Sequence, residues 1–133
     1  ALLEDRSALA NVMTPLLFDR QYTLGQAKQK AMEAMRMMRM EEYARRKVSQ
    51  LSGGQKQRLA ICRAIANDPQ LILADEPTGA LDRRTADEVM SSLVRLNAQG
   101  HTMLIVTHDP RIAQRCHTVY VMEDGCISRK EPE

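Results

Sequence analysis

The apolar run Leu71–Ala74 leads directly into two carboxylates, Asp75 and Glu76, and this pattern limits the possible folds more than any other. A short run of apolar residues alone is typical of a strand that is buried on both faces. A second run of this kind, Thr102–Val106, follows after a helix-length segment. Strands that alternate with helices predict right-handed crossovers and a mainly parallel sheet. We therefore expect an α/β fold in which helices flank the sheet.

The ends of these two strands carry polar side chains that are suited to chemistry. Ligands bind at the carboxyl ends of strands in open α/β sheets, and Asp75, Glu76 and His108 all follow strand ends. Neighbouring residues of a strand point in opposite directions, so the two carboxylates can divide their work. One can face a magnesium ion and the other a reacting water. A solvated acidic turn is the alternative, and the apolar run before the pair argues against it.

A glycine pair opens the helix that precedes the first strand, in the octapeptide Leu51-Ser52-Gly53-Gly54-Gln55-Lys56-Gln57-Arg58. Two glycines let the backbone approach an anion closely, and a helix N-terminus offers unpaired N–H groups with partial positive charge. Ser52 adds a hydroxyl and Gln55 an amide. The residues by themselves predict a phosphate-binding turn, with an ordinary helix entry as the alternative. Asp82 is placed to cap a further helix that runs to about Asn97.

The octapeptide resembles the signature motif of ATP-binding cassette (ABC) ATPases and matches it letter for letter through Gln55. The segment Leu71–Glu76 resembles a Walker B motif followed by the catalytic glutamate. Gly79-Ala80-Leu81-Asp82 resembles the D-loop, and His108 resembles the switch histidine. These motifs occur in the family order. Within the family, the run Ala74–Asp82 looks like the branch that serves lipoprotein release, macrolide export and antimicrobial-peptide transport.

The resemblance implies a role for each matching residue. Asp75 would bind Mg²⁺, Glu76 would act as the general base, and His108 would contact the γ-phosphate and orient the attacking water. The residues implied in ATP binding, the last of them at the dimer interface, are Ser52, Gly53, Gly54, Gln55 and Asp82. The implied cofactors are ATP and Mg²⁺. The implied partners are a second nucleotide-binding domain and a membrane permease, with the protein cytoplasmic and peripheral on the inner face of the cell membrane.

The same resemblance divides the chain into two parts. Residues 1–50 correspond to a segment of a helical, all-α subdomain, and residues 51–133 to the signature helix and the C-terminal half of a partial P-loop NTPase core. None of the six glycines begins a G-x-x-x-x-G-K-[ST] phosphate loop, so Walker A is absent, as is the Q-loop. We expect the chain to be the C-terminal part of a larger subunit, to fold incompletely and to hydrolyse no ATP alone.

The first third of the chain is expected to be helical. Thr23 and Gln26 form a T-x-x-Q capping box, a specific signal for a helix start. The apolar residues that then recur at helical spacing are Leu24, Ala27, Ala31, Met35 and Met38. Pro15 is expected to end an earlier, shorter amphipathic stretch, because proline disfavours helix at the residue before it.

Five of the nine methionines crowd the end of this predicted helix. Met35 and Met38 belong to its apolar face, whereas Met37 and Met40 fall outside that face. Methionine is flexible and common on adaptable binding surfaces. Two interpretations remain open: loose core packing with two exposed residues, or a docking surface for a partner helix.

Charge, cysteines and hydropathy exclude several other classes. A net charge of +2 is too small to indicate a nucleic-acid partner. Three cysteines without C-x-x-C spacing indicate reduced, mostly buried thiols and no zinc site. No apolar run approaches the ~18 residues that span a bilayer, and no signal peptide is visible, so we expect an intracellular chain. Two alternatives to the transporter subunit are a soluble ABC-type ATPase acting on nucleic acid and a non-catalytic module that docks on a permease.

Overall fold

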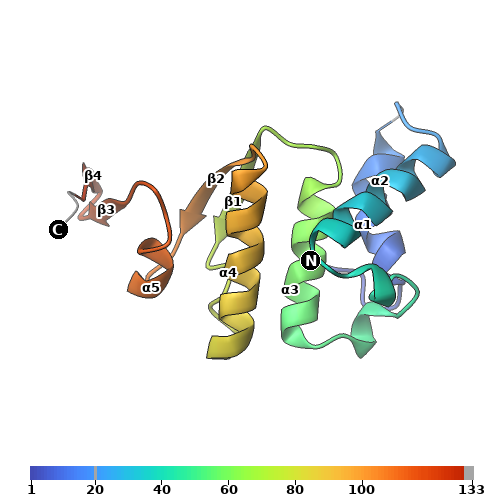
Figure 1. Ribbon diagram of the computed structural model, residues 1–133, viewed down its shortest axis with the longest axis horizontal. Coiled ribbons are helices and arrows are strands. Elements are labelled where there is room, and N and C mark those ends of the chain that lie inside the picture. The colour runs from blue at the N-terminus through green and yellow to red at the C-terminus, as the bar shows by residue number, and fades with distance from the viewer. Residues whose placement is uncertain (20, 131–133) are drawn as a thin grey trace.

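The computed structural model describes residues 1–19 and 21–130, and an all-α part precedes an α/β part along an elongated molecule (Figure 1). The all-α part contains three α-helices and two short 3-10 turns. Their bounds are α1 (Ala8–Phe18), α2 (Leu24–Met37), the turns Glu41–Tyr43 and Val48–Gln50, and α3 (Gly53–Ile65). None of the described helices is both long and apolar enough to cross a bilayer.

The α/β part follows α3 and confirms the predicted fold class. Its elements are β1 (Leu71–Asp75), α4 (Arg83–Ala98), β2 (Thr102–Val106), α5 (Pro110–Ala113), β3 (Tyr120–Glu123) and β4 (Cys126–Arg129). β1 and β2 pair in parallel, and α4 is the crossover between them. β3 and β4 form a separate antiparallel hairpin near the C-terminal end (Figure 1). Its turn residues Asp124 and Gly125 both have positive φ, as a type I′ turn requires.

The helix starts follow the capping signals of the sequence. Thr23 Oγ1 accepts a hydrogen bond from the N–H of Gln26 at 3.2 Å, and Gln26 Oε1 accepts one from the N–H of Thr23 at 2.8 Å. Both halves of the predicted capping box are therefore present. Behind them, the predicted apolar face of α2 is buried at Ala27, Ala31 and Met35, whereas Leu24, in the first turn, is exposed, so its place in that face is wrong.

The end of α2 overturns part of the methionine prediction. Arg39 adopts a left-handed conformation, with φ of 55°. The N–H of Met40 then bonds back to the carbonyl of Met35 at 2.8 Å, and that of Arg39 to Arg36 at 3.0 Å. This is a Schellman motif, which turns the residue after the left-handed one back onto the helix. Met40 is consequently 0% exposed, so its predicted exposure is wrong, whereas Met37 is exposed, as predicted.

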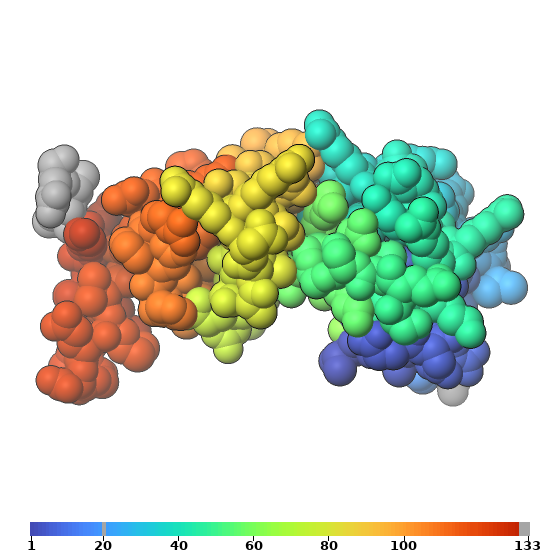
Figure 2. Space-filling view, turned by 90° about the horizontal axis from the view of Figure 1, so that it is seen from below, coloured from blue at the N-terminus to red at the C-terminus, as the bar shows by residue number. Residues whose placement is uncertain are grey.

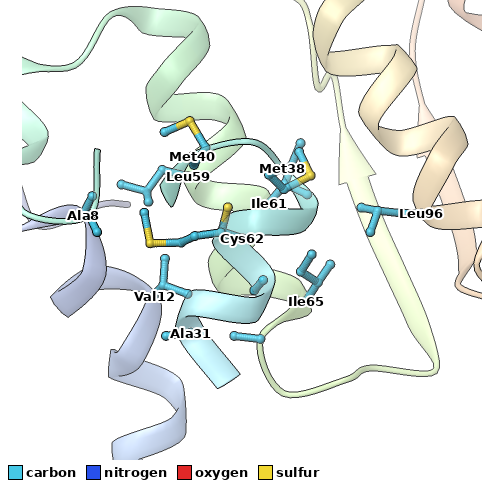
Figure 3. Packing of buried hydrophobic residues seen from close by; sticks show 14 of the residues in the cluster. Ala8, Val12, Ala31, Met38, Met40, Leu59, Ile61, Cys62, Ile65 and Leu96 are labelled. Carbon is cyan, nitrogen blue, oxygen red and sulfur yellow. The ribbon is translucent and has the colours of Figure 1, made fainter. Parts of the chain in front are cut away.

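The hydrophobic core lies between the three helices of the all-α part and continues toward α4 (Figure 3). Met38 and Met40, at the end of α2, lie near Ile61 and Leu59 of α3, and all four side chains are buried. On the far side, Leu96 of α4 points toward Ile65. This core therefore extends from the helical part to α4.

Helix α1 continues through Pro15 to Phe18, so the predicted end of the helix before the proline is wrong. Proline has no N–H to donate to the carbonyl four residues earlier, which destabilises a helix interior. Here Val12 and Leu16, on either side of the proline, are both fully buried. Their burial, at about 1.5–3 kcal/mol per aliphatic side chain, offsets the loss.

The parallel strands are covered on one face only, so the expectation of strands buried on both faces is wrong. Ile72 is buried, whereas Leu73 is 69% exposed. In β2, Leu104 and Val106 are also exposed, on alternate residues. The apolar run thus correctly predicts a strand. Within the described part of the chain, however, its alternate residues lie on a buried face and on an exposed face.

The three cysteines are free thiols in the described residues. Cys62 is buried, and this burial raises the pKa of its thiol to about 12. Cys116 is half-buried and Cys126 is exposed, so the expectation of mostly buried thiols holds for Cys62 alone.

The start of α3 packs closely against the start of α4. A Cβ atom at Gly54 would overlap Cγ2 of Thr85, while one at Gly53 would lie an ordinary 3.7 Å from Cδ2 of Leu81. Glycine at 54 is therefore required by the close approach of the two helices, and glycine at 53 is not required by packing.

The Schellman turn generates a stability prediction. Met40→Ala removes a fully buried side chain and is expected to lower the free energy of unfolding by about 2–5 kcal/mol. Met37→Ala, three positions away and exposed, is the matched control and should cost less than about 1 kcal/mol. Equilibrium urea unfolding followed by circular dichroism measures both. Equal losses in the two variants would contradict the burial of Met40.

The α3–α4 contact generates a second prediction. Gly54→Ala forces its new methyl group into Thr85 and is expected to destabilise the fold by about 1–3 kcal/mol. Thr85→Ser removes the overlapping methyl group, so the double variant should recover most of the loss. Gly53→Ala serves as the control. Thermal unfolding compares the four chains, and a double variant no more stable than Gly54→Ala alone would refute the contact.

Candidate functional site

Glu76 and His108 are in direct contact at one edge of the parallel sheet. Glu76 Oε1 accepts hydrogen bonds from the backbone N–H of His108 at 2.9 Å and from its ring Nδ1 at 2.6 Å. Because an ionised carboxylate can only accept, Nδ1 carries the proton in this arrangement. The Nε2 atom is then the ring nitrogen left to face a ligand, on a side chain that is 86% exposed.

The pairing of β1 with β2 brings these two residues together. Asp75 lies opposite Val106 in the parallel register, so the residues after each strand meet at the same edge. The N–H of Glu76 donates to the carbonyl of Val106 at 2.8 Å, which extends the pairing by one bond. Glu76 itself has φ of 44°, a left-handed conformation that is uncommon for a non-glycine residue. The backbone therefore turns sharply at this carboxylate.

The pKa of the Glu76 carboxyl is lowered from its ordinary value. The hydrogen bond from the His108 side chain is the largest cause, and the backbone N–H of His108 and the hydroxyl of Thr107 act in the same direction. Partial burial opposes them and is outweighed. Glu76 is therefore held ionised, as a group that accepts a proton must be.

Thr107 is a residue of this site that the sequence motifs did not single out for a role. Its Oγ1 donates to Glu76 Oε2 at 3.3 Å and accepts from the N–H of Asp109 at 3.0 Å. It thus fixes the second carboxylate oxygen and the turn that follows β2. The sequence feature that could have indicated this role is the hydroxyl residue between the end of β2 and His108. Threonine side chains at such positions commonly hydrogen-bond to nearby backbone groups and so form turns.

Asp75 differs from its neighbour in its environment. Its carboxylate is exposed and makes no hydrogen bond among the described residues, whereas that of Glu76 makes three. The two adjacent carboxylates thus have separate surroundings, as the alternation along a strand predicts. No three His, Cys, Asp or Glu side chains in the described part of the chain gather as a metal-binding cluster.

The signature turn, residues 51–55, forms a second group. Ser52 Oγ accepts from the N–H of Gln55 at 3.3 Å, and Gln55 Oε1 accepts from the N–H of Ser52 at 2.9 Å. In this capping box both side chains act as acceptors through their oxygen atoms. The Ser52 hydroxyl hydrogen and the Gln55 amide hydrogens are therefore still able to donate. Gly53 and Gly54 occupy the first two helical positions, where backbone N–H groups have no acceptor within the helix. The turn therefore presents several donors at a helix N-terminus.

Asp82 begins α4 beside the signature turn. Its carboxylate accepts from the N–H of Thr85 at 3.1 Å and from the Thr85 hydroxyl at 2.6 Å, and these bonds lower its pKa. Thr85 is also the residue that contacts Gly54. The predicted cap at Asp82 is confirmed, and Thr85, which the motifs did not single out, links it to the signature turn.

The candidate residues thus fall into two groups. One consists of Ser52, Gly53, Gly54, Gln55 and Asp82, and the other of Asp75, Glu76 and His108. Within the described residues, no hydrogen bond or ion pair joins the groups.

Comparison with known proteins finds relatives in the family that the motifs resemble. The family model described as "ABC transporter" matches residues 2–79. A macrolide export ATP-binding/permease protein of Paracoccus denitrificans is 46% identical over 126 residues, which cover 95% of this chain and 19% of that protein. A lipoprotein-releasing system ATP-binding protein of Paramagnetospirillum magneticum is 44% identical over 127 residues, 95% of this chain and 56% of that one.

A solved structure gives the matching fold. It is the dimeric, post-hydrolysis cassette MJ0796 bound to ADP and Pi, which is 37% identical and superposes with a TM-score of 0.80 over 99% of this chain and 60% of that one. MJ0796 is a protein of Methanocaldococcus jannaschii. The chain thus spans little more than half of the lipoprotein-releasing subunit and of MJ0796, and about a fifth of the macrolide export protein. These relatives include members of the branch that its sequence resembles. This chain belongs to the ABC transporter family.

Proposed function

We propose that the chain is part of the ATP-binding subunit of an ABC transporter that couples ATP hydrolysis to export of a peptide, lipoprotein or drug. The observation that carries the proposal is the Glu76 carboxylate, held ionised by His108 and Thr107 beside Asp75. The relatives' names support the transport role, because they describe macrolide export and lipoprotein release.

In this proposal, the sheet edge performs the hydrolytic chemistry. Glu76 accepts a proton from the attacking water, and its hydrogen bonds to His108 and Thr107 fix the orientation of its ionised carboxylate. His108 donates its Nδ1–H to Glu76, and its Nε2 donates to the γ-phosphate in the imidazolium form, in which both ring nitrogens carry a proton. The Glu76–His108 contact thus orders the base and the phosphate ligand relative to one another.

Asp75 suits the magnesium role that we assign to it. Magnesium in phosphoryl-transfer sites keeps several waters and is held by one or two carboxylates together with substrate phosphates. A single exposed carboxylate that bonds to none of the described residues fits this chemistry, and a complete protein cage is not needed. When bound, Mg²⁺ neutralises charge that develops on the phosphates.

We assign the signature turn to a nucleotide held by a second copy of the domain. The donors at Ser52–Gln55 suit phosphate oxygens, and the α3 N-terminus adds partial positive charge. Among residues 1–19 and 21–130, no bond joins the two groups of candidate residues, which supports action on different nucleotides. The dimeric state of MJ0796 supports such an arrangement.

The remaining assignments concern organisation. Residues 1–50 would form a segment of the helical subdomain and residues 51–133 the signature helix with half of the ATPase core.

A membrane permease would be the transport partner, and the subunit would then lie at the cytoplasmic face of the membrane. Only Met37 of the two methionines considered for docking is exposed enough to take part. The 133 residues contain no phosphate loop with its lysine, so we propose that they do not hydrolyse ATP alone.

The catalytic assignment is tested in a subunit that carries this sequence together with a Walker A loop. Glu76→Gln is expected to lower the ATP turnover number by about 100-fold or more with ATP binding retained, because it removes a general base. Glu123→Gln, an exposed acid in β3, is the charge-matched control and should leave turnover unchanged. Phosphate release measures both, and the 133-residue chain should release none above background. Full turnover in Glu76→Gln would refute the role of Glu76.

The Glu76–His108 contact also predicts a pH dependence. Because the folded-state pKa of Glu76 is depressed, its contribution to stability is present above the unfolded-state pKa and is lost as pH falls through the folded value. Carboxyl NMR titration should show Glu76 below the usual range in the native chain and nearer to that range in His108→Ala. His117→Ala, at an exposed histidine outside the site, is the control. An identical Glu76 titration in the native chain and His108→Ala would contradict the hydrogen bond.

A further inference from the structure

A groove of about 790 Å³ runs between the end of α2, the middle of α3 and the length of α4. In the space-filling view the surface of α4, in yellow, lies directly beside the green to cyan surface of α3 and the segment that follows α2 (Figure 2). The groove is separate from the sheet edge that carries Glu76 and His108, neither of which lines it. It therefore calls for an explanation of its own.

Positive charge dominates both walls of this groove. The five arginines that line it are Arg39, Arg58, Arg83, Arg84 and Arg95. Asp87 and Glu88 are its acidic residues, so the lining carries a net charge of three positive units. Arg84 is paired with Glu88 at 3.5 Å, on the exposed surface of α4. The other arginines form no ion pair among the described residues.

Arg58 carries the observation that points to a ligand. Its Nε–H is buried and has no hydrogen-bond partner among the described residues. Buried donors of charged groups are normally satisfied, because leaving one unpaired after it loses water is unfavourable. The guanidinium presents its donors in a planar fork that matches a carboxylate or phosphate. The two terminal guanidinium nitrogens of Arg58 also make no hydrogen bond among the described residues but, unlike Nε, they are not buried, so they are the donors that an anion in the groove can reach.

The length of the groove selects between these anions. Arg83 and Arg95 are twelve residues apart on one helix, which corresponds to about 18 Å along its axis. A single phosphate group cannot bridge charges that are spread over this length and over two walls. A peptide segment that bears several carboxylates can do so, because its side chains repeat along the same direction.

We propose that this arginine groove binds an acidic segment of a partner protein, with carboxylates of the segment accepting from Arg58, Arg39 and the arginines of α4. The proposal does not depend on ATP hydrolysis, since it uses none of the residues assigned to that chemistry. It makes the α2–α3–α4 junction an interaction surface whose specificity comes from paired guanidinium–carboxylate bonds.

The experiment measures binding of a fluorescent twelve-residue Ala/Glu peptide, with glutamates four residues apart, to a subunit that carries this sequence together with a Walker A loop, by anisotropy at low salt. Arg58→Gln and Arg83→Gln are each expected to weaken binding about tenfold, the loss of one charge-assisted hydrogen bond. Arg129→Gln, which removes the same charge from exposed β4, should change it less than twofold. Added salt should weaken binding progressively.

Several outcomes overturn the proposal. One is no binding by the native chain, and another is an equal loss in Arg129→Gln, which would indicate net charge alone. Equally tight binding of a peptide with glutamine in place of glutamate would exclude carboxylate recognition. Inorganic tripolyphosphate that binds more tightly than the peptide would identify a phosphate site instead. Circular dichroism melting checks folding, and the exposed Arg83 variant decides the result if Arg58→Gln is destabilised.

Discussion

The in-register parallel pairing of β1 and β2 is the interaction on which the candidate chemistry depends. It places the residue after Asp75 against the carbonyl of Val106 and so brings Glu76 within hydrogen-bond distance of His108, thirty-two residues later. A shift of one residue in this register would reverse which side chains face α4 and would separate the carboxylate from the histidine. The bond from Thr107 and the low pKa of Glu76 both follow from this pairing.

The contact between α3 and α4 is the second organising feature, because it joins the helical part to the α/β part. Gly54 leaves room for Thr85, and Thr85 in turn satisfies the carboxylate of Asp82 at the start of α4. Two helix N-termini therefore lie side by side, with free donors on one and a carboxylate on the other. The same two helices diverge into the arginine groove, so one packing arrangement shapes two different surfaces.

At the end of α2, the backbone conformation of one residue determines which side chain is buried in the core. A left-handed Arg39 closes the helix and returns Met40 to the apolar interior, next to Met38 and Leu59 (Figure 3). Glycine is the usual residue at such a position because it has no Cβ. Here the arginine side chain points into the groove instead, so the turn that buries Met40 also supplies one of its charges.

Local sequence signals were enough to predict where α2 and α4 begin, the parallel α/β pattern and the family motifs. Capping boxes at Thr23 and Ser52 and the cap at Asp82 join residues three apart, and such local bonds depend on little else. The packed fold was needed to establish the burial of Met40, the passage of α1 through Pro15, the exposed face of the strands and the roles of Thr107 and Thr85. Each of these depends on backbone turns or on contacts between elements distant in the chain. Periodicity describes a single regular element, whereas the burial of a side chain is set by the neighbours packed against that element.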